Sequence, residues 1–454
     1  MTPDESPPGG TTPSELQEPP LATEQVEDQA AASESDVQLA AVAPEVLADS
    51  LSEYLRAWGR RIRSGESGAL PIVVGLIVII IFFQAERSQF DSAINIVNLF
   101  QQASIYILLG AAEVFALILS EIDLSVGFVL AVGGFITLEL IASPINLPWW
   151  VGVLGGVGAT GVIGYIQGNL ITRLHVPSFV VTLAGLLVWE GVTIELASAD
   201  KSAVGGVISV SPTSPVYHLV NSNMSVALSW IVLAVVLGLF AALTLTRAAR
   251  RRAQGLTAPP LSITLVTIAV TAIGGILLVY VCTLNRGSLT VLKGVPWVIP
   301  FVGLVLVAYS ILLGRTRVGR YMYAIGANPE AARRAGINVQ RIRRVAFTLS
   351  AATAGLAGLV YASLLGSIST GVDGGTYTLY GVAAAVIGGA SLFGGRGKPI
   401  NALLGGLVIG VVFNGLALMG ISAAGQFIAT GIVLLVAASV DALVRRRGAA
   451  EGGI

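Results

Sequence analysis

Long apolar segments follow one another from residue 69 to residue 443, with only short polar connections between most of them. A helix needs about 20 apolar residues to cross a bilayer, and most of these segments are near that length. Because lipid offers the backbone no hydrogen-bond partner, such segments fold as helices. The sequence therefore predicts an all-α, polytopic membrane protein with about twelve helices. The expected spans are 69–85, 96–119, 124–142, 149–171, 178–197, 226–246, 261–281, 297–314, 345–366, 378–393, 400–419 and 426–443.

Glycine and alanine are frequent within these spans. Small residues four apart, such as Ala354/Gly358 and Gly406/Gly410, predict close approach between helix backbones in a compact bundle. Residues 378–393 form a short and glycine-rich span, for which a re-entrant or broken helix is the alternative to a full crossing.

The two ends of the chain differ from the apolar body. Residues 1–50 contain eleven acidic residues and neither lysine nor arginine. Residues 1–43 are polar and poor in aromatic residues, which predicts a disordered acidic tail. Residues 44–66 have helical apolar spacing with arginines toward the end, which predicts a cytoplasmic amphipathic helix. The transmembrane domain is expected over 67–445 and a cytoplasmic tail over 446–454.

The positions of the basic residues indicate orientation. If the N-terminus lies in the cytosol, the inside segments hold 22 lysines and arginines and the outside segments hold 4. Cytoplasmic loops of membrane proteins carry this excess of positive charge. We therefore expect both termini in the cytosol and a multi-pass protein of the inner membrane, in contact with membrane lipid. The arginine clusters are explained by orientation, and no nucleic-acid partner is expected.

The composition and motifs exclude several classes of site. One cysteine and two histidines exclude an intramolecular disulfide and make a metal centre improbable. No GxSxG or HExxH motif is present, and the Gly397-Lys398 pair lacks the upstream glycine of a phosphate-binding loop. We expect no catalytic residues, no metal and no cofactor.

The connection over 315–344 is long enough to hold structure of its own. Asn328 can cap a helix, Pro329 suits its first position and Glu330 suits its positive end. Gly336 can terminate it, so a helix is expected at about 329–335. It either lies on the lipid surface as a basic helix or docks a soluble partner.

Polar residues within or between the spans are candidates for a translocation path. In EIDLSVG, residues 121–127, Asp123 either caps a helix beginning near Leu124 or belongs to a broken helix that lines the path. The candidates taken forward are Glu121, Asp123, Ser125, Asn169 and Asn414. Hydrogen bonding between helices is the competing role for such groups, and for Glu113, Glu139, Glu190, Gln101, Gln102 and Gln167.

Two sets of residues resemble a known family. Glu330-Ala331-Ala332, followed by Gly336, resembles the EAA signature of ATP-binding-cassette importer permeases, although its Ile-x-Leu-Pro continuation is missing. GINV at 336–339, EIDLSVG, VPSFVVTL at 176–183 and GGASLFGGRG at 388–397 are similar to the ribose/xylose branch of these permeases. Segments near 211–215, 250–256 and 285–296 resemble xylose-type members, which carry an added helix pair. YTLYGVAA at 377–384 departs from the branch.

The resemblance implies the permease bundle of an importer that carries a monosaccharide, of pentose or xylose type. A cytosolic ATPase subunit, an extracytoplasmic sugar-binding protein and a second permease copy are the implied partners. The binding protein would meet the outer loops 198–225 and 367–377. The implied coupling loop comprises Asn328, Glu330, Ala331, Ala332, Arg333 and Gly336.

Three alternatives remain open at this stage. A related permease could carry a nucleoside or a branched-chain amino acid. A secondary transporter would couple to an ion gradient and need no docking helix. A membrane-embedded enzyme would need convergent catalytic groups, for which one cysteine and two histidines are a poor basis.

Overall fold

The protein is seen in a computed structural model that describes residues 70–199, 205–256, 258, 260–288, 290–432, 435 and 439. The predicted acidic tail, the amphipathic helix over 44–66 and the tail over 446–454 lie outside these residues. The chain divides into two units, one of residues 60–241 with 268–454 and one of residues 1–59 with 242–267. In the described residues the second unit comprises the end of one long helix and the beginning of the next.

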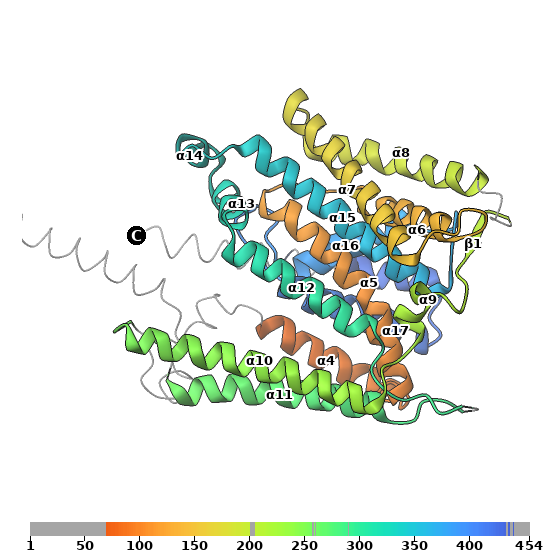
Figure 1. The fold of residues 1–454 in the computed structure, drawn as a ribbon, viewed down its shortest axis with the longest axis vertical. Helices are drawn as coiled ribbons and strands as arrows, with labels where there is room; N and C mark the ends of the chain where they lie inside the picture. The colour runs from red at the N-terminus through yellow and green to blue at the C-terminus, as the bar shows by residue number, and fades with distance from the viewer. Residues whose placement is uncertain are drawn as a thin grey trace, which may run out of the picture. The chain divides into compact units, whose positions relative to one another are not determined.

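The described residues form a helical fold with one pair of short strands (Figure 1). The helices of the first half are α4 (Leu70–Glu86), α5 (Ala93–Ile118), α6 (Val126–Ile141), α7 (Trp149–Leu174), α8 (Ser178–Ala199) and α9 (Pro215–Asn221). The remaining elements are α10 (Val226–Ala253), α11 (Leu261–Thr283), α12 (Val298–Arg315), α13 (Arg317–Ala327), α14 (Pro329–Arg334), α15 (Val339–Leu365), α16 (Gly374–Ile387), α17 (Pro399–Leu418), β1 (Val207–Ser209) and β2 (Ser367–Ser369).

Each expected span within the described residues coincides with a helix. Eight helices are long and apolar enough to cross a membrane, namely α5, α7, α8, α10, α11, α12, α15 and α17. Four further apolar helices are shorter and include α4, α6, α16 and a helix over Ala423–Ile432. The all-α membrane fold is confirmed, and the count of twelve crossings stays a prediction.

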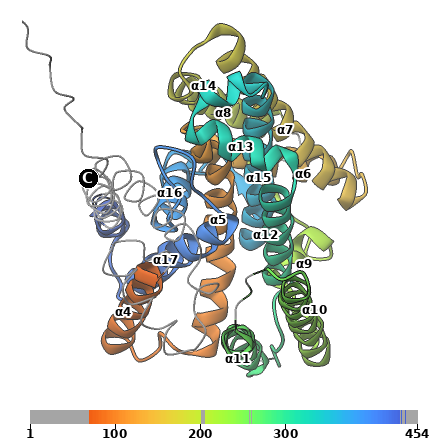
Figure 2. The same ribbon diagram turned by 90° about the vertical axis from the view of Figure 1, so that its left-hand side faces the viewer.

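Helix α5 forms the centre of the larger unit (Figure 2). It packs against α12, α15, α16 and α17, and 19 of its 26 residues are buried. Helix α8 buries only five of its 22 residues, so most of its surface is free to face lipid or another chain. The two helices are similarly apolar, and it is packing that separates a core helix from a peripheral one.

The predicted close approaches between helices are present. A Cβ at Gly406 of α17 would lie 2.7 Å from the backbone nitrogen of Ile107 in α5. A Cβ at Gly410 would lie 2.8 Å from the Cβ of Ala103, one turn away on α5. Neither position has room for a side chain, which is the reason that the sequence places glycine there.

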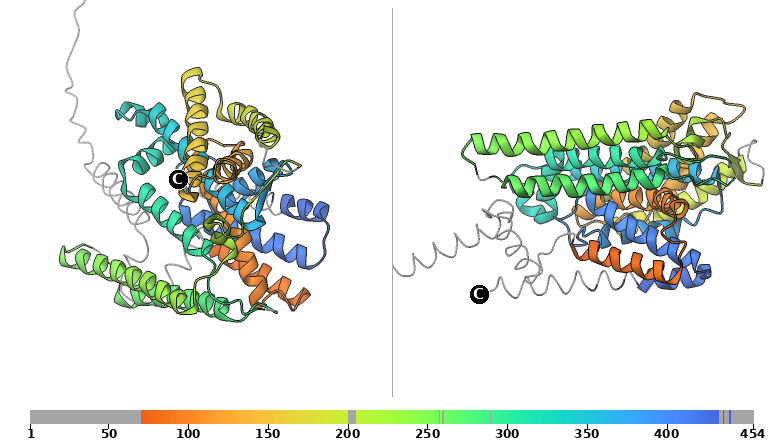
Figure 3. Two further views of the ribbon diagram at one scale, coloured as in Figure 1. Left: turned by 45° about the vertical axis from the view of Figure 1, so that its right-hand side comes forward. Right: turned by 90° about the horizontal axis from the view of Figure 1, so that it is seen from below.

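Two features were not predicted: a pair of short strands, and a neck at which the two ends of the α10–α11 hairpin, Met224 and Val295, lie side by side. Strands β1 and β2 pair antiparallel, with Ile208 opposite Ile368, so the expected outer loops 198–225 and 367–377 are joined. The chain enters the α10–α11 hairpin beside the point where it leaves, since Met224 N donates to Val295 O at 2.9 Å. Over residues 226–241 and 268–283 the two helices of this hairpin run side by side (Figure 3).

Candidate coupling and translocation site

Helix α14 lies at one end of the bundle, between α13 and α15 (Figure 1, Figure 2). Asn328 Oδ1 accepts a hydrogen bond from Ala331 N at 2.9 Å, and Pro329 occupies the first helical position. These two contacts satisfy and fix the first turn, as the sequence predicts. The helix covers Pro329–Arg334, one residue shorter than expected, and Ala335 stands at its C-cap.

Gly336 ends α14 through its backbone conformation. Its φ is +80°, a left-handed geometry that residues other than glycine rarely adopt. Ile337 N donates to Ala332 O at 3.0 Å, which closes the last turn in the manner of a Schellman motif. No atom lies within 4 Å of the place a Cβ would occupy at Gly336. Backbone geometry, and not packing, therefore requires glycine here.

The outer surface of α14 carries charge that remains accessible. Glu330 pairs with Arg333 at 3.1 Å and with Arg334 at 3.3 Å, while 57% of the Glu330 side chain stays exposed. Ala332 is buried against the protein, and Ala331 is exposed. The six predicted coupling residues thus lie within one short capped helix and its flanking residues, and the exposed side of this helix presents both acidic and basic groups.

Helix α13 connects α14 to the bundle, and the sequence analysis did not predict it. Tyr323 Oη donates to Gly397 O at 2.5 Å, and burial raises the pKa of Tyr323, which keeps the phenol protonated as a donor. Gly395 N donates to Ile118 O at 2.9 Å. The segment 388–397, predicted only from resemblance, therefore lies where α13 meets the end of α5.

An ion pair stands beside the break between α5 and α6. Glu121 Oε1 lies 3.0 Å from Arg343 Nη2, and the side chains are 11% and 31% exposed. Both line a cavity of about 250 Å³ together with Arg333 of α14 and His175. Residues of the coupling loop and of the segment between α5 and α6 therefore line the same cavity.

Asp123 is buried at the centre of the break. Its Oδ1 accepts from Ser125 N at 3.1 Å and Ser125 Oγ at 2.6 Å. Its Oδ2 accepts from Ser350 Oγ of α15 at 3.0 Å. Ser125 Oγ in turn accepts from Gln167 Nε2 of α7 at 2.9 Å. This network joins the break to two helices and gives each carboxylate oxygen of Asp123 a donor.

Asp123 does not cap α6, although a cap near Leu124 was one of the two roles expected of it. Helix α6 begins at Val126, and its N-cap residue Ser125 makes no side-chain capping bond. The Asp123 carboxylate is occupied within its own turn and by Ser350, so it cannot reach the first turn of α6. Thr378 of α16 does so, accepting from Gly127 N at 3.0 Å. Thr378 belongs to 377–384, the segment that departs from the family pattern.

The five predicted path residues do not form one site. Glu121, Asp123 and Ser125 lie together at the break. Asn169 lies on α7, where its Nδ2 donates to Tyr165 O at 2.8 Å. Asn414 is buried in α17, and its Oδ1 has no partner among the described residues.

Sequence reasoning missed two groups at the break, and it considered a third, Glu113, without taking it forward. Ser350 and Thr378 are hydroxyls inside apolar spans, where nothing in the local pattern distinguishes them. Glu113 of α5 is fully buried beside the backbone and the carboxylate of Asp123. Its position within a span was its only signal.

A bundle of apolar helices, with a capped helix exposed at one end next to a buried break in the bundle, is the architecture of a multi-pass membrane protein. Residues 95–438 match the family described as the branched-chain amino acid transport system / permease component. The chain belongs to this permease family.

Curated relatives match most of the chain. The xylose transport system permease protein of Escherichia coli strain K12 is 33% identical over 379 residues, covering 83% of this chain and 92% of the relative. The corresponding protein of Haemophilus influenzae is 32% identical over 82% of this chain and 95% of its own. The D-allose transport system permease protein of Escherichia coli is 27% identical over 82% and 90%. No solved structure matches the chain.

Proposed function

We propose that this chain is the permease subunit of an ATP-driven importer that carries a monosaccharide, of xylose or pentose type, across the inner membrane. The observation that carries the proposal is the match to xylose and allose permeases over more than four fifths of the chain. The exposed, capped helix α14 supports the ATP-driven part, because an ion-coupled transporter needs no such projection. A separate cytosolic ATPase subunit would supply the hydrolysis.

The coupling loop and the break between α5 and α6 suggest how motion would be transmitted. We infer that α14 seats on the ATPase and that its displacement moves α13 and the cavity wall that holds Arg333. The Glu121–Arg343 pair, on the same wall, is 3.0 Å long and ties the break to α15. Displacement of α14 would thus be transmitted to the hydrogen-bond network of Asp123, and the path would open alternately to the two sides of the membrane.

The remaining partners follow from the same proposal. A second copy of the chain would complete the pathway, and an extracytoplasmic binding protein would deliver the sugar to the loops that β1 and β2 join. The 22-to-4 distribution of basic residues supports cytosolic termini.

A branched-chain amino acid is the second candidate substrate, because the matching family carries that description. Uptake of labelled xylose, competed with unlabelled leucine, separates the two. Inhibition by excess xylose and not by leucine is expected. Uptake of labelled leucine together with no uptake of labelled xylose would replace the sugar with the amino acid.

The coupling proposal is tested by co-expressing the chain with its candidate ATPase and binding protein and purifying through the chain. Gly336→Pro fixes φ near −65°, so it should abolish the end of α14, ATPase co-purification and xylose uptake. Gly336→Asn tolerates a left-handed φ and has open space, so it should retain most of both.

Glu330→Arg reverses an exposed charge on α14 and should also lose the ATPase, whereas Glu86→Arg, an equally exposed reversal at the end of α4, should not. Retention of ATPase and uptake in both Gly336→Pro and Glu330→Arg would show that α14 is not the docking helix. Uptake that survives ATP depletion but collapses with an uncoupler would favour the secondary transporter.

A further inference from the structure

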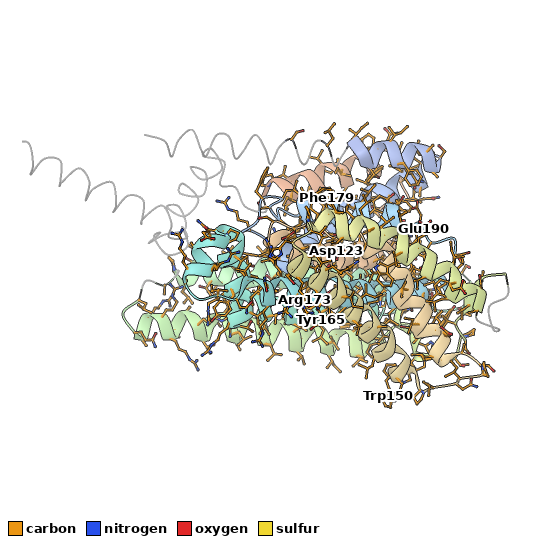
Figure 4. The ribbon with its side chains drawn as sticks, turned by 90° about the horizontal axis from the view of Figure 1, so that it is seen from above. Asp123, Trp150, Tyr165, Arg173, Phe179 and Glu190 are labelled. Atoms are coloured by element: carbon orange, nitrogen blue, oxygen red, sulfur yellow. The ribbon has the colours of Figure 1, made fainter. Side chains whose placement is uncertain are left out.

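The outward side of α7 has the features of a surface that faces lipid. Trp149 and Trp150 are 49% and 52% exposed at its start, and Arg173 is exposed near its end. At 1.5 Å per residue, Trp150 and Arg173 are separated along the helix by about 35 Å, close to the roughly 30 Å of a hydrocarbon core. Figure 4 shows Trp150 toward one end of α7, with Tyr165 and Arg173 toward the other. Aromatic and basic residues mark such interfaces.

Two shallow grooves lie on either side of Tyr165, toward the Arg173 end. One, of about 410 Å³, is bounded by α7 and α15 and is lined by Tyr165, Arg341, Arg344, Val345, Thr348 and Leu349. The other, of about 350 Å³, follows α7 and is lined by Tyr165, Ile166, Asn169, Leu170, Arg173 and Leu174. The surface that each groove exposes is mostly apolar, with the arginines gathered at one end.

The arginines of these grooves lack acidic partners. No described carboxylate forms an ion pair with Arg173, Arg341 or Arg344. Arg344 donates to Gln340 O at 3.4 Å and to Asn169 Oδ1 at 3.5 Å, both long contacts, and its guanidinium also lies beside the Tyr165 hydroxyl. Arg343, by contrast, is turned to the other side of α15 and paired with Glu121. A ligand that complements this surface would carry a negative charge to pair with the three arginines and apolar chains to fill the grooves.

We propose that this surface, the Tyr165 grooves, binds one anionic phospholipid. The phosphate diester would accept hydrogen bonds from the three guanidinium groups, and one acyl chain would lie in each groove beside the Tyr165 ring. Basic pockets between membrane helices bind acidic headgroups in this way, and arginine suits phosphate geometry. A contact between this surface and the same surface of a second copy fits worse, because no acidic residue lines either groove to neutralise the arginines of the other copy. The proposal does not depend on which solute is carried.

The test compares lipid retained by the purified, full-length chain. The protein is reconstituted in nanodiscs of equal phosphatidylglycerol and phosphatidylcholine, extracted in mild detergent, and its bound lipid is counted by native mass spectrometry. Wild type should retain phosphatidylglycerol selectively. The triple variant Arg173→Ala/Arg341→Ala/Arg344→Ala should lose it, with each arginine contributing about five-fold. The matched control Arg247→Ala/Arg250→Ala/Arg251→Ala removes the same charge from the exposed end of α10 and should retain it.

Further measurements distinguish a two-chain lipid site from a headgroup contact, a simple anion site and a subunit interface. Leu170→Trp/Leu349→Trp should fill the grooves and lower the retention of phosphatidylglycerol, while every arginine stays in place. Unchanged lipid retention in this variant would show a headgroup contact alone and overturn the two-chain proposal. Millimolar inorganic phosphate should compete poorly, and efficient competition would indicate a simple anion site instead. Conversion of a dimer to a monomer in the triple variant, with unchanged lipid, would indicate a subunit interface. If the triple variant does not fold, Arg341→Ala alone carries the test, because that side chain is exposed.

Discussion

Helix α14 and the segment between α5 and α6 each hold a carboxylate surrounded by hydrogen-bond donors, Glu330 in the first and Asp123 in the second. The two carboxylates contribute differently to stability. Glu330 makes two ion pairs on a surface where water competes for both, so each pair contributes about 0 to 1 kcal/mol at most. Asp123 makes its three hydrogen bonds where water does not reach. Removing a buried partner leaves the remaining donors unsatisfied, which costs more than the bond itself contributed. One carboxylate is therefore available to a partner, and the other holds the protein together.

The largest effect is expected at Asp123. Asp123→Ala leaves the donors at Ser125 and Ser350 unsatisfied and should lower the free energy of unfolding by about 3 kcal/mol. Asp123→Asn keeps an acceptor toward Ser125 and places an amide opposite the Ser350 hydroxyl, so it should lose less than about 1 kcal/mol. Thermal unfolding in detergent measures both. Equal losses in the two variants would show that the network does not decide stability at the break.

An intermediate effect is expected at the Glu121–Arg343 pair, which is neither fully buried nor exposed. A double-mutant cycle with Glu121→Gln and Arg343→Gln should give a coupling energy of about 1 to 2 kcal/mol, between surface and buried pairs. The control cycle pairs Glu121→Gln with Arg341→Gln, which forms no described ion pair. A coupling energy as small as that of the control would place the pair with Glu330 on the surface side of the comparison.

A smaller loss is expected where α13 contacts the loop after α16. Tyr323→Phe removes only the hydroxyl that donates to Gly397 O and should cost about 1 kcal/mol of stability. Burial raises the pKa of Tyr323 in the folded protein above the unfolded value near 10, so the phenol stays protonated in both states up to about pH 9, and its contribution to stability should be lost only as pH rises above about 10. The proposed coupling adds a second readout, since ATPase activity stimulated by sugar should weaken in the variant. A variant equal to wild type in both measurements would remove Tyr323 from the coupling path.

The smallest change in stability is expected at Glu330. Glu330→Gln should alter the free energy of unfolding by less than about 0.5 kcal/mol, because both its ion pairs are exposed. Its effect on ATPase co-purification should nevertheless exceed that of Tyr323→Phe. A loss of stability comparable to Asp123→Ala would contradict the distinction between the two regions.

The same comparison explains what the sequence could predict. The cap, first residue and end of α14 are fixed by Asn328, Pro329 and Gly336, which lie within nine residues of one another, so local rules apply. The break depends on Ser350 and Thr378; Ser350 lies 227 positions from Asp123, and Thr378 lies 251 from Gly127. Only folding brings these groups together. The apolar spans were predictable because lipid imposes them, whereas three-residue strands with the sequences VIS and SIS carry too little pattern to be recognised.

The neck of the α10–α11 hairpin has a consequence for how this chain could have been assembled. The segments that enter and leave the hairpin meet at Met224 and Val295, where Arg286 also donates to Gly294 O at 3.0 Å. A segment whose two ends are neighbours can be gained or lost without rerouting what precedes or follows it. Joining residue 223 to residue 296 by a tight turn would leave α9 and α12 at the same separation. The hairpin is thus a separable segment, which a lineage of transporters could acquire in a single insertion.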